Sequence, residues 1–287
     1  MYINFFNKID NFCNPSKTAI IFYKIFGKVY QCKIDSYINQ LEILLHQVEN
    51  TQYYEKCLEK LILLLTLEKR NEHIIYYVNQ SIHYYRRSND HSNELKSLYK
   101  LLDIYENENE NDDRHIFIAN CHKDIAHLLE YNFELDDAVN HLLIARSIMN
   151  KYSTYKIEIQ QLNLKIACIY ISRGLYDISN EYLYGIIFFK PKYTVYHKEN
   201  EIIIMYILNL LAKGDMVSVI RKKLEEITLI YLNFYETDEY DFVINIISSV
   251  ENNDNEHFVF EIHRFSQIHQ LPIFRDLFIT IKKRMSI

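Results

Sequence analysis

The chain has 287 residues, of which 49% are hydrophobic, and a formal net charge of −6. Four Gly and three Pro are too few for a turn-rich β fold and favour long helices with short connections. The negative charge argues against general nucleic-acid binding, which needs a clustered basic excess.

The N-terminal 32 residues show no repeated pattern. Residues 1–18 are mixed and contain Asn14-Pro15, a pair that disfavours a helix. Residues 19–27 form a short, aromatic and nearly uncharged segment. An apolar run of this length is compatible with an exposed loop or with a helix packed into the core.

From residue 33 onward the hydrophobic periodicity predicts helices in antiparallel pairs, with Asp136 and Asp215 as capping residues at helix starts. Residues 106–113, an acidic tract, are predicted to form a solvated loop. The longest apolar run, 202–212, is half the roughly 20 residues that a transmembrane helix needs and is predicted to be a buried helix. The expected pairs are 33–49 with 52–67, 72–87 with 92–105, 114–131 with 135–150, 155–173 with 176–189, and 196–213 with 216–235. Shorter helices are predicted at 240–250, 256–266 and 272–285.

Three successive windows repeat a pattern of small and large residues at a spacing of about forty residues. In the clearest window, Ala167 and Ser179 allow two helices to approach, and Gly174 turns the chain between them. The same window contains Tyr170, Tyr176, Leu183, Ile186 and Pro191, and the preceding window repeats the register with Ala126, Leu129, Ala138, Leu142 and Ala145. A third window, around Gly214 and Asp215, follows it more loosely.

This pattern predicts an all-α fold, a TPR-like right-handed helical solenoid of antiparallel helix pairs with a compact C-terminal helical cap. The expected organisation is an N-terminal segment (1–32), helical repeats (33–235) and the cap (236–287). Stacked repeats expose a long concave surface for partners, so the architecture favours binding over catalysis.

Motifs for catalysis or cofactor binding were not found: the chain has no GxxxxGK[ST], GxGxxG or HExxH. Five cysteines without CxxC spacing, and no recognisable signal peptide, indicate reduced thiols in a cytosolic protein. The best metal candidate is Cys121, Asp124 and His127, with His122 nearby, on one predicted helix. A small core cysteine beside solvated polar residues is the simpler interpretation, because structural zinc sites usually recruit a second ligand pair. We predict no catalytic residue, no metal and no cofactor.

Three stretches carry a resemblance to a known family. Residues 22–27 followed by 33–35 are similar to a Phe-rich membrane loop leading into a first repeat helix. Residues 114–130 align without a gap to a central helix, and 137–141 continue into its partner. Residues 246–258 and 274–283 are similar to the family's C-terminal helices. Over residues 21–283 the chain thus resembles the soluble NSF attachment proteins, most closely the alpha type.

The resemblance implies a non-enzymatic adaptor in vesicle fusion that binds SNARE complexes and recruits the NSF ATPase for their disassembly. It would be cytoplasmic and peripherally associated with endomembranes. Arg114 and Lys165 would contact the SNARE complex, and Phe22, Ile25 and Phe26 would attach the protein to the membrane. At three other positions where the family has a basic residue, the chain has Asn120, Gln161 and Glu201.

For NSF, the resemblance implies contacts through Asp215, Glu251 and Ile287. The family ends in an acidic tail with a near-terminal leucine, whereas this chain ends in Arg284-Met-Ser-Ile287. Its run of Lys282, Lys283 and Arg284 would fit a basic patch, but we predict that it is the cationic last turn of a helix, where positive charge is favoured.

Each of these assignments has a simpler alternative. Phe22, Ile25 and Phe26 would also fit a core-packed helix. Arg114 and Lys165 would fit ordinary solvated positions, Asp215 a helix N-cap, and Glu251 a loop charge. The alternative function is a generic TPR-type scaffold that binds another helical or peptide partner, with no role in SNARE recycling.

Overall fold

The computed structural model describes residues 7–9, 27–48, 53–68, 70–107, 114–152, 154–188, 199–266 and 272–286. In this part of the chain all regular structure is helical, with thirteen α-helices, α3 to α15, and one 3-10 helix, η1. The prediction of an all-α fold is confirmed. The chain divides into two compact units, unit 1 (Met1–Ala145) and unit 2 (Arg146–Ile287).

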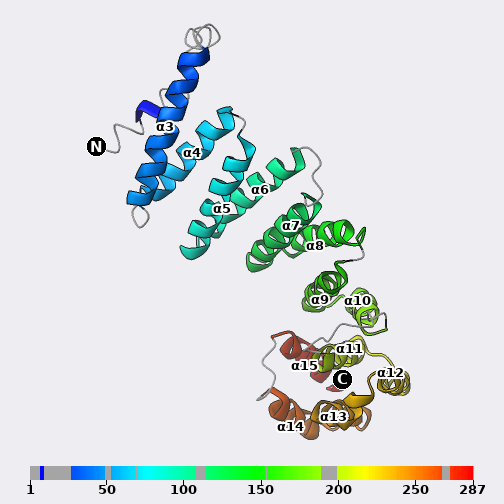
Figure 1. The fold of residues 1–287 in the computed structure, drawn as a ribbon. Coiled ribbons are helices and arrows are strands. Elements are labelled where there is room, and N and C mark those ends of the chain that lie inside the picture. Colours follow the sequence, from blue (N-terminus) through cyan, green and yellow to red (C-terminus); the bar gives the residue numbers. More distant parts are fainter. Residues whose placement is uncertain are drawn as a thin grey trace. The chain divides into compact units, whose positions relative to one another are not determined.

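Unit 1 is a row of helices in which each packs against its neighbour in sequence, from α3–α4 through to α6–α7 (Figure 1). Its buried side chains recur every three or four residues, as in α5, where Ile74, Tyr77, Val78 and Ile82 face the core. The helices are α3 (Gly27–Gln47), α4 (Tyr54–Glu68), α5 (Asn71–Arg87), α6 (His91–Asn107), α7 (Arg114–Tyr131) and α8 (Leu135–Met149), whose last turn belongs to unit 2.

Unit 2 is built around α11, which contacts α10, α12, α13 and α15 (Figure 1). All eleven residues from Ile202 to Ala212 are buried. A helix covered on every side must be apolar all round, which explains why this run lacks amphipathic periodicity and confirms that it is a buried helix. The helices of the unit are α9 (Lys156–Ser172), α10 (Tyr176–Phe188), α11 (Glu199–Lys213), α12 (Val217–Ile230), η1 (Leu232–Glu236), α13 (Asp238–Glu251), α14 (Asn255–Ser266) and α15 (Pro272–Met285).

The last helix does not extend the stack. Instead, α15 folds back on α11 and α9. Ala167 of α9 and Met285 of α15 belong to one continuous hydrophobic core. The C-terminal helices therefore close unit 2 by sharing the core of α9–α12.

The small residues of the repeat pattern lie where close helix contact requires them. Ala167 and Ser179 are fully buried, and α9 packs closely on α10. Gly174 between these helices has φ +71°, a left-handed conformation that glycine adopts without steric cost. In the preceding window, Ala126 and Ala138 are also fully buried.

Several predicted boundaries are wrong. The first repeat helix begins at Gly27 instead of residue 33, and α6 continues to Asn107, inside the acidic tract. The single helix predicted for 216–235 is α12 followed by η1. The break falls at Tyr231, which has φ −112° and ψ 71° and whose hydroxyl donates to the carbonyl of Ile187, 2.9 Å away. This contact and the burial of Phe234 both stabilise the chain path at the break.

The predicted capping residues also differ from the structure. Asp136 lies inside the first turn of α8, where a carboxylate is favoured by the helix dipole. The N-cap of α12 is Met216, and no side chain caps that end. The interpretation of Asp215 as a helix cap is therefore wrong.

Candidate functional site

Several helix ends of unit 2 meet around Tyr176, the first residue of α10. Its carbonyl oxygen accepts a hydrogen bond from Nδ2 of Asn209, a fully buried residue of α11, at 2.9 Å. Its hydroxyl donates to Oγ1 of Thr280 on α15 at 3.0 Å. These bonds fix the start of α10 against the second halves of α11 and α15.

The turn between α11 and α12 lies at the same end. Gly214 has φ +92°, and the guanidinium group of Arg284, near the end of α15, covers it so closely that any Cβ would collide with it. The backbone conformation favours glycine at this position, whereas the flexible Arg284 side chain could move away from an added Cβ. The contact places the basic end of α15 directly over the turn that carries Lys213 and Asp215.

Lys213 links two carboxylates at this turn. Its Nζ is 2.8 Å from Oδ1 of Asp177 and 3.2 Å from Oδ1 of Asp215. The hydrogen bonds to Asp177 and Asp215 raise the pKa of Lys213. Asp215 thus forms an ion pair within its own turn.

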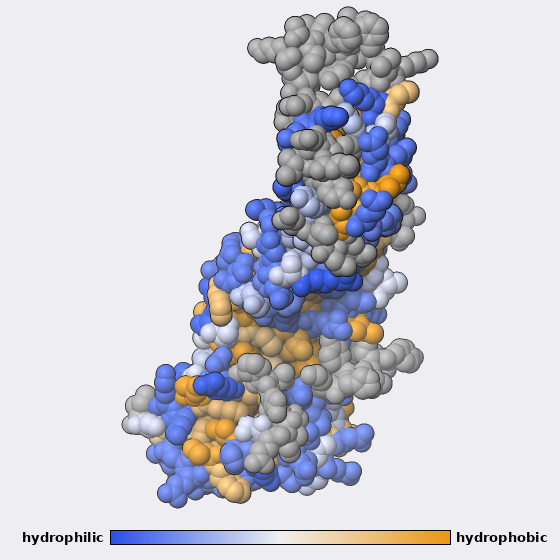
Figure 2. Space-filling view, turned by 90° about the vertical axis from the view of Figure 1, so that its left-hand side faces the viewer, coloured by the Kyte–Doolittle hydropathy of each residue, from blue (hydrophilic) through white to orange (hydrophobic). Residues whose placement is uncertain are grey.

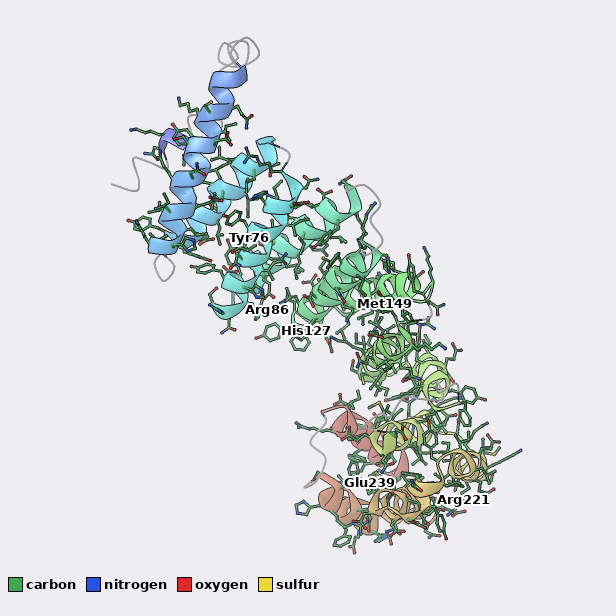
Figure 3. All side chains as sticks on the ribbon, viewed as in Figure 1. Tyr76, Arg86, His127, Met149, Arg221 and Glu239 are labelled. Atoms are coloured by element: carbon green, nitrogen blue, oxygen red, sulfur yellow. The ribbon has the colours of Figure 1, made fainter. Side chains whose placement is uncertain are left out.

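Glu251 is the last residue of α13 and does not lie in a loop. A carboxylate at a helix C-terminus is opposed by the helix dipole. Arg221 of α12, labelled in Figure 3, offsets this cost. Its Nη2 is 2.7 Å from Oε2 of Glu251 and 3.3 Å from Oγ of Ser248. The contact also shows that the start of α12 lies against the end of α13.

The acidic groups Asp177, Asp215 and Glu251, with their cations Lys213 and Arg221, form what we call the turn end of unit 2. The side chain of Asp177 is 77% exposed, that of Glu251 49% and that of Asp215 23%. Met216, the residue after Asp215, is 71% exposed. The surface thus offers carboxylates and an apolar side chain to a partner, and each carboxylate already has an internal cation that a partner must replace or share.

The candidate metal ligands of α7 do not converge. Cys121 is buried, and its pKa is raised to about 12, mainly by burial. Asp124 points to solvent and pairs with Arg86 of α5 at 3.5 Å, while His127 is exposed on the surface of α7 (Figure 3). Among the residues that the structure describes, no three His, Cys, Asp or Glu side chains are grouped so as to hold a metal ion.

Arg114 and Lys165, the predicted SNARE-binding residues, lie in different units. Arg114 is the half-buried first residue of α7, and its Nη2 donates to the carbonyl oxygen of Glu106 in the last turn of α6 at 2.5 Å. Lys165 is half-buried in the middle of α9. Asn120 and Gln161 are exposed, and Glu201 is half-buried.

The other predicted contact residues, Phe22, Ile25, Phe26 and Ile287, lie outside the described residues. Sequence analysis did not identify Lys213 and Arg221 as parts of the acidic site. Arg221 and Glu251 are thirty residues apart, and Lys213, at the end of α11, reaches Asp177 at the start of α10. No periodic pattern in the sequence marks such pairs.

None of the described helices combines the length and the apolar character needed to cross a membrane. A search of curated proteins found no matching sequence. The family model described as soluble NSF attachment protein, SNAP, matches residues 52–286, which include α4 to α15. Because this match covers well over half of the chain, the protein belongs to the soluble NSF attachment protein family.

Proposed function

We propose that this protein is a non-enzymatic adaptor in vesicle fusion that binds SNARE complexes and recruits an NSF-type ATPase for their disassembly. The observation that carries the proposal is the family match over residues 52–286, because adaptors of this kind define the family. The exposed carboxylates of Asp177 and Glu251 at the turn end of unit 2 support it, since they offer a docking surface. We place the chain nearest the alpha type of the family, at the cytoplasmic surface of endomembranes.

On the SNARE side, we propose that Arg114 and Lys165 contribute positive charge toward an acidic helical bundle. Arg114 has a second role, because its bond to the Glu106 carbonyl satisfies an end of α6. Its replacement should therefore affect both stability and binding.

The central experiment is a pull-down in which immobilised protein captures an assembled soluble SNARE complex and, through both, an NSF-type ATPase held in its ATP state. We expect a ternary complex. Capture of neither component would contradict the proposed function and favour a generic helical scaffold for another partner.

The first prediction concerns the turn end of unit 2. Replacing Asp215 and Glu251 with Lys should weaken capture of the ATPase by about tenfold or more, because each change replaces a carboxylate with a cation beside Lys213 or Arg221. Binding of the SNARE complex should change little. The readout is ATPase bound per SNARE complex at fixed salt.

A matched variant controls for net charge. Glu225 and Glu236 are exposed residues of α12 and η1, toward the opposite end of α12, and their replacement with Lys changes the net charge equally. If both double variants lost ATPase capture equally, the net charge of the protein, and not the turn end, would govern recruitment of the ATPase.

The second prediction concerns Phe22, Ile25 and Phe26, which we propose insert shallowly into lipid. Burial of each phenylalanine would contribute roughly 1.5–3 kcal/mol, enough for weak and reversible binding. Phe22→Ser/Phe26→Ser should abolish flotation with liposomes and leave binding of soluble SNARE complex intact. Unchanged flotation would rule out this membrane contact.

The third prediction concerns the C-terminus. The protein should stimulate the ATPase poorly compared with a chimera that carries an acidic, leucine-containing tail, because basic residues 282–284 precede Ile287. ATPase rates with surface-immobilised wild type, Ile287→Ala and the chimera provide the comparison. Full stimulation by wild type that survives Ile287→Ala would show that this terminus does not control the ATPase.

A further inference from the structure

Asn209 differs from the residues around it in α11. The buried run Ile202–Ala212 otherwise consists of aliphatic side chains, Met205 and Tyr206. Hydrophilic residues predominate at the surface that Figure 2 shows, whereas Asn209 is fully buried. Its Oδ1 has no hydrogen-bond partner among the described residues. Because a buried polar atom without a partner lowers stability, core packing alone does not explain this asparagine.

Asn209 and Lys213 connect α11 to two consecutive residues of α10. Nδ2 of Asn209 donates to the carbonyl oxygen of Tyr176 at 2.9 Å, and Nζ of Lys213 is 2.8 Å from Oδ1 of Asp177. Residues four apart lie on the same side of a helix, so one side of α11 makes both contacts. The side chain of Asp177 is 77% exposed, so the bond from the buried Asn209 is better shielded from competing water.

The connection between these two helices does not by itself fix how they align. Tight turns at Gly174 and Gly214, both with positive φ, join α9 to α10 and α11 to α12. Between α10 and α11, in contrast, the ten residues 189–198 separate Phe188 from Glu199. Hydrophobic contacts are not directional, so an apolar helix face accepts a neighbour in more than one register. A directional bond at one position selects a single register, as a buried asparagine does in a coiled coil.

A change of register would alter the turn end of unit 2. A slip by one helical turn moves α10 by about 5.4 Å along α11, which separates Asp177 from Lys213. Asp177 is the most exposed of the three carboxylates of the turn end. The register of α10 therefore determines which carboxylates lie together at this surface.

We propose that Asn209 is a positioning residue for the turn end of unit 2. It fixes the register of α10 on α11 and thereby holds Asp177 beside Lys213 and Asp215, where Asp177 is a further contact residue for the ATPase. This role rests on the proposed function, in which the turn end recruits the ATPase, and adds two residues to it. A buried polar side chain that lowers stability but specifies one arrangement has the same role in other helical assemblies.

Asn209→Leu removes the amide and keeps a side chain of similar size. The urea midpoint of the variant should not fall below that of wild type, because the unpaired Oδ1 is lost together with one hydrogen bond. Capture of the ATPase, measured as ATPase bound per SNARE complex at fixed salt, should weaken about three- to fivefold. In a folded variant, a midpoint lowered in step with capture would mean that Asn209 serves stability alone, and would overturn the proposal.

Tyr231→Phe is the matched control, because the hydroxyl of Tyr231 donates to the carbonyl of Ile187 near the other end of α10, 2.9 Å away. The substitution removes one hydrogen bond to the backbone of the same helix without touching Asn209 or Asp177. Its capture of the ATPase should stay within about 1.5-fold of wild type. Equal loss with Tyr231→Phe and Asn209→Leu would show that any loosening of α10 weakens capture, which excludes a specific positioning role.

A double-mutant cycle tests whether Asn209 acts through Asp177. Asp177→Asn alters an exposed side chain and should weaken capture about threefold. In that background Asn209→Leu should weaken capture by less than about 1.5-fold further, since the carboxylate that Asn209 positions is already absent. Equal losses in both backgrounds, or normal capture by Asp177→Asn, would contradict the proposal. If Asn209→Leu does not fold, Asn209→Ala, which cannot overpack the core, takes its place in the cycle.

The outcomes distinguish this role from the proposed function. If wild type captures the ATPase and Asn209→Leu captures it equally, Asn209 is not a positioning residue, although the adaptor function stands. If wild type captures no ATPase, both fail.

Discussion

Replacing Leu208 with Ala should destabilise unit 2 by about 3–4 kcal/mol, the largest effect that we expect from a single substitution. Leu208 is fully buried near the middle of α11, and four other helices contact this helix. The rigid surroundings on every side limit how far the structure can collapse into the space that the deleted methyl groups leave. The loss is a large part of the 5–15 kcal/mol by which a domain is typically stable.

Urea denaturation followed by far-UV circular dichroism measures this loss. Leu229→Ala is the matched control, because Leu229 lies on α12 and is 78% exposed, so its truncation should change stability by less than about 0.5 kcal/mol. Similar destabilisation by both substitutions would mean that α11 is not the centre of the core.

The sequence predicted helices well where local patterns determine them. The bounds of α7 and α15 match the predictions, because charged or proline residues mark their ends. The apolar run 202–212 was also predicted as a buried helix, since it is too short to span a membrane and too apolar for a helix on the protein surface. The predicted helix bounds are wrong where a contact between residues far apart in the sequence determines where a helix ends. Tyr231 ends α12 because its hydroxyl reaches the carbonyl of Ile187, forty-four residues earlier.

The candidate site was predictable only in part, for the same reason. Asp215 and Glu251 were predicted as contact residues from the family resemblance, and the structure shows that Lys213 and Arg221 pair with them. That α15 turns back over Gly214 and lies on α9 could not be read from periodicity, because a solenoid pattern predicts that each helix packs on the next.

The second large effect is a loss of stability in mild acid, which originates in two histidines of unit 1. His122 of α7 is buried, and its Nδ1 lies 2.7 Å from Nδ1 of His141 on α8. Nε2 of His141 is 3.3 Å from the hydroxyl of Tyr99 on α6. At this Nδ1–Nδ1 distance one imidazole donates its proton to the lone pair of the other, so the pair is satisfied when at least one ring is neutral.

Burial, and then the neighbouring His141, lowers the pKa of His122 to about 4. Burial also lowers the pKa of His141, against the opposing charge of Asp137. An unfolded histidine titrates near its ordinary pKa of 6.5, so between about pH 6.5 and 4 the unfolded chain binds a proton that the folded chain excludes. The stability contributed by neutral His122 is therefore complete above this window and falls as the pH falls through it. At about 1.36 kcal/mol per pH unit, the free energy of unfolding falls by about 3 kcal/mol between pH 6.5 and 4.

His122→Asn isolates this contribution, because an amide still hydrogen-bonds to His141 but does not titrate. The free energy of unfolding of both proteins is measured by urea denaturation at several pH values between about 7 and 4.5. As the pH falls, it should decrease more steeply for wild type than for His122→Asn. Taking the difference between the two proteins at each pH removes the contribution of the other titrating groups. His127→Asn, at an exposed position of the same helix, should leave the wild-type slope unchanged. Parallel pH profiles for wild type and His122→Asn would mean that His122 accepts its proton in the folded state. His122 would then donate its Nδ1 proton to a neutral His141. Only protonation of both rings would separate them, since two imidazolium groups each present a proton at Nδ1 and repel one another at 2.7 Å.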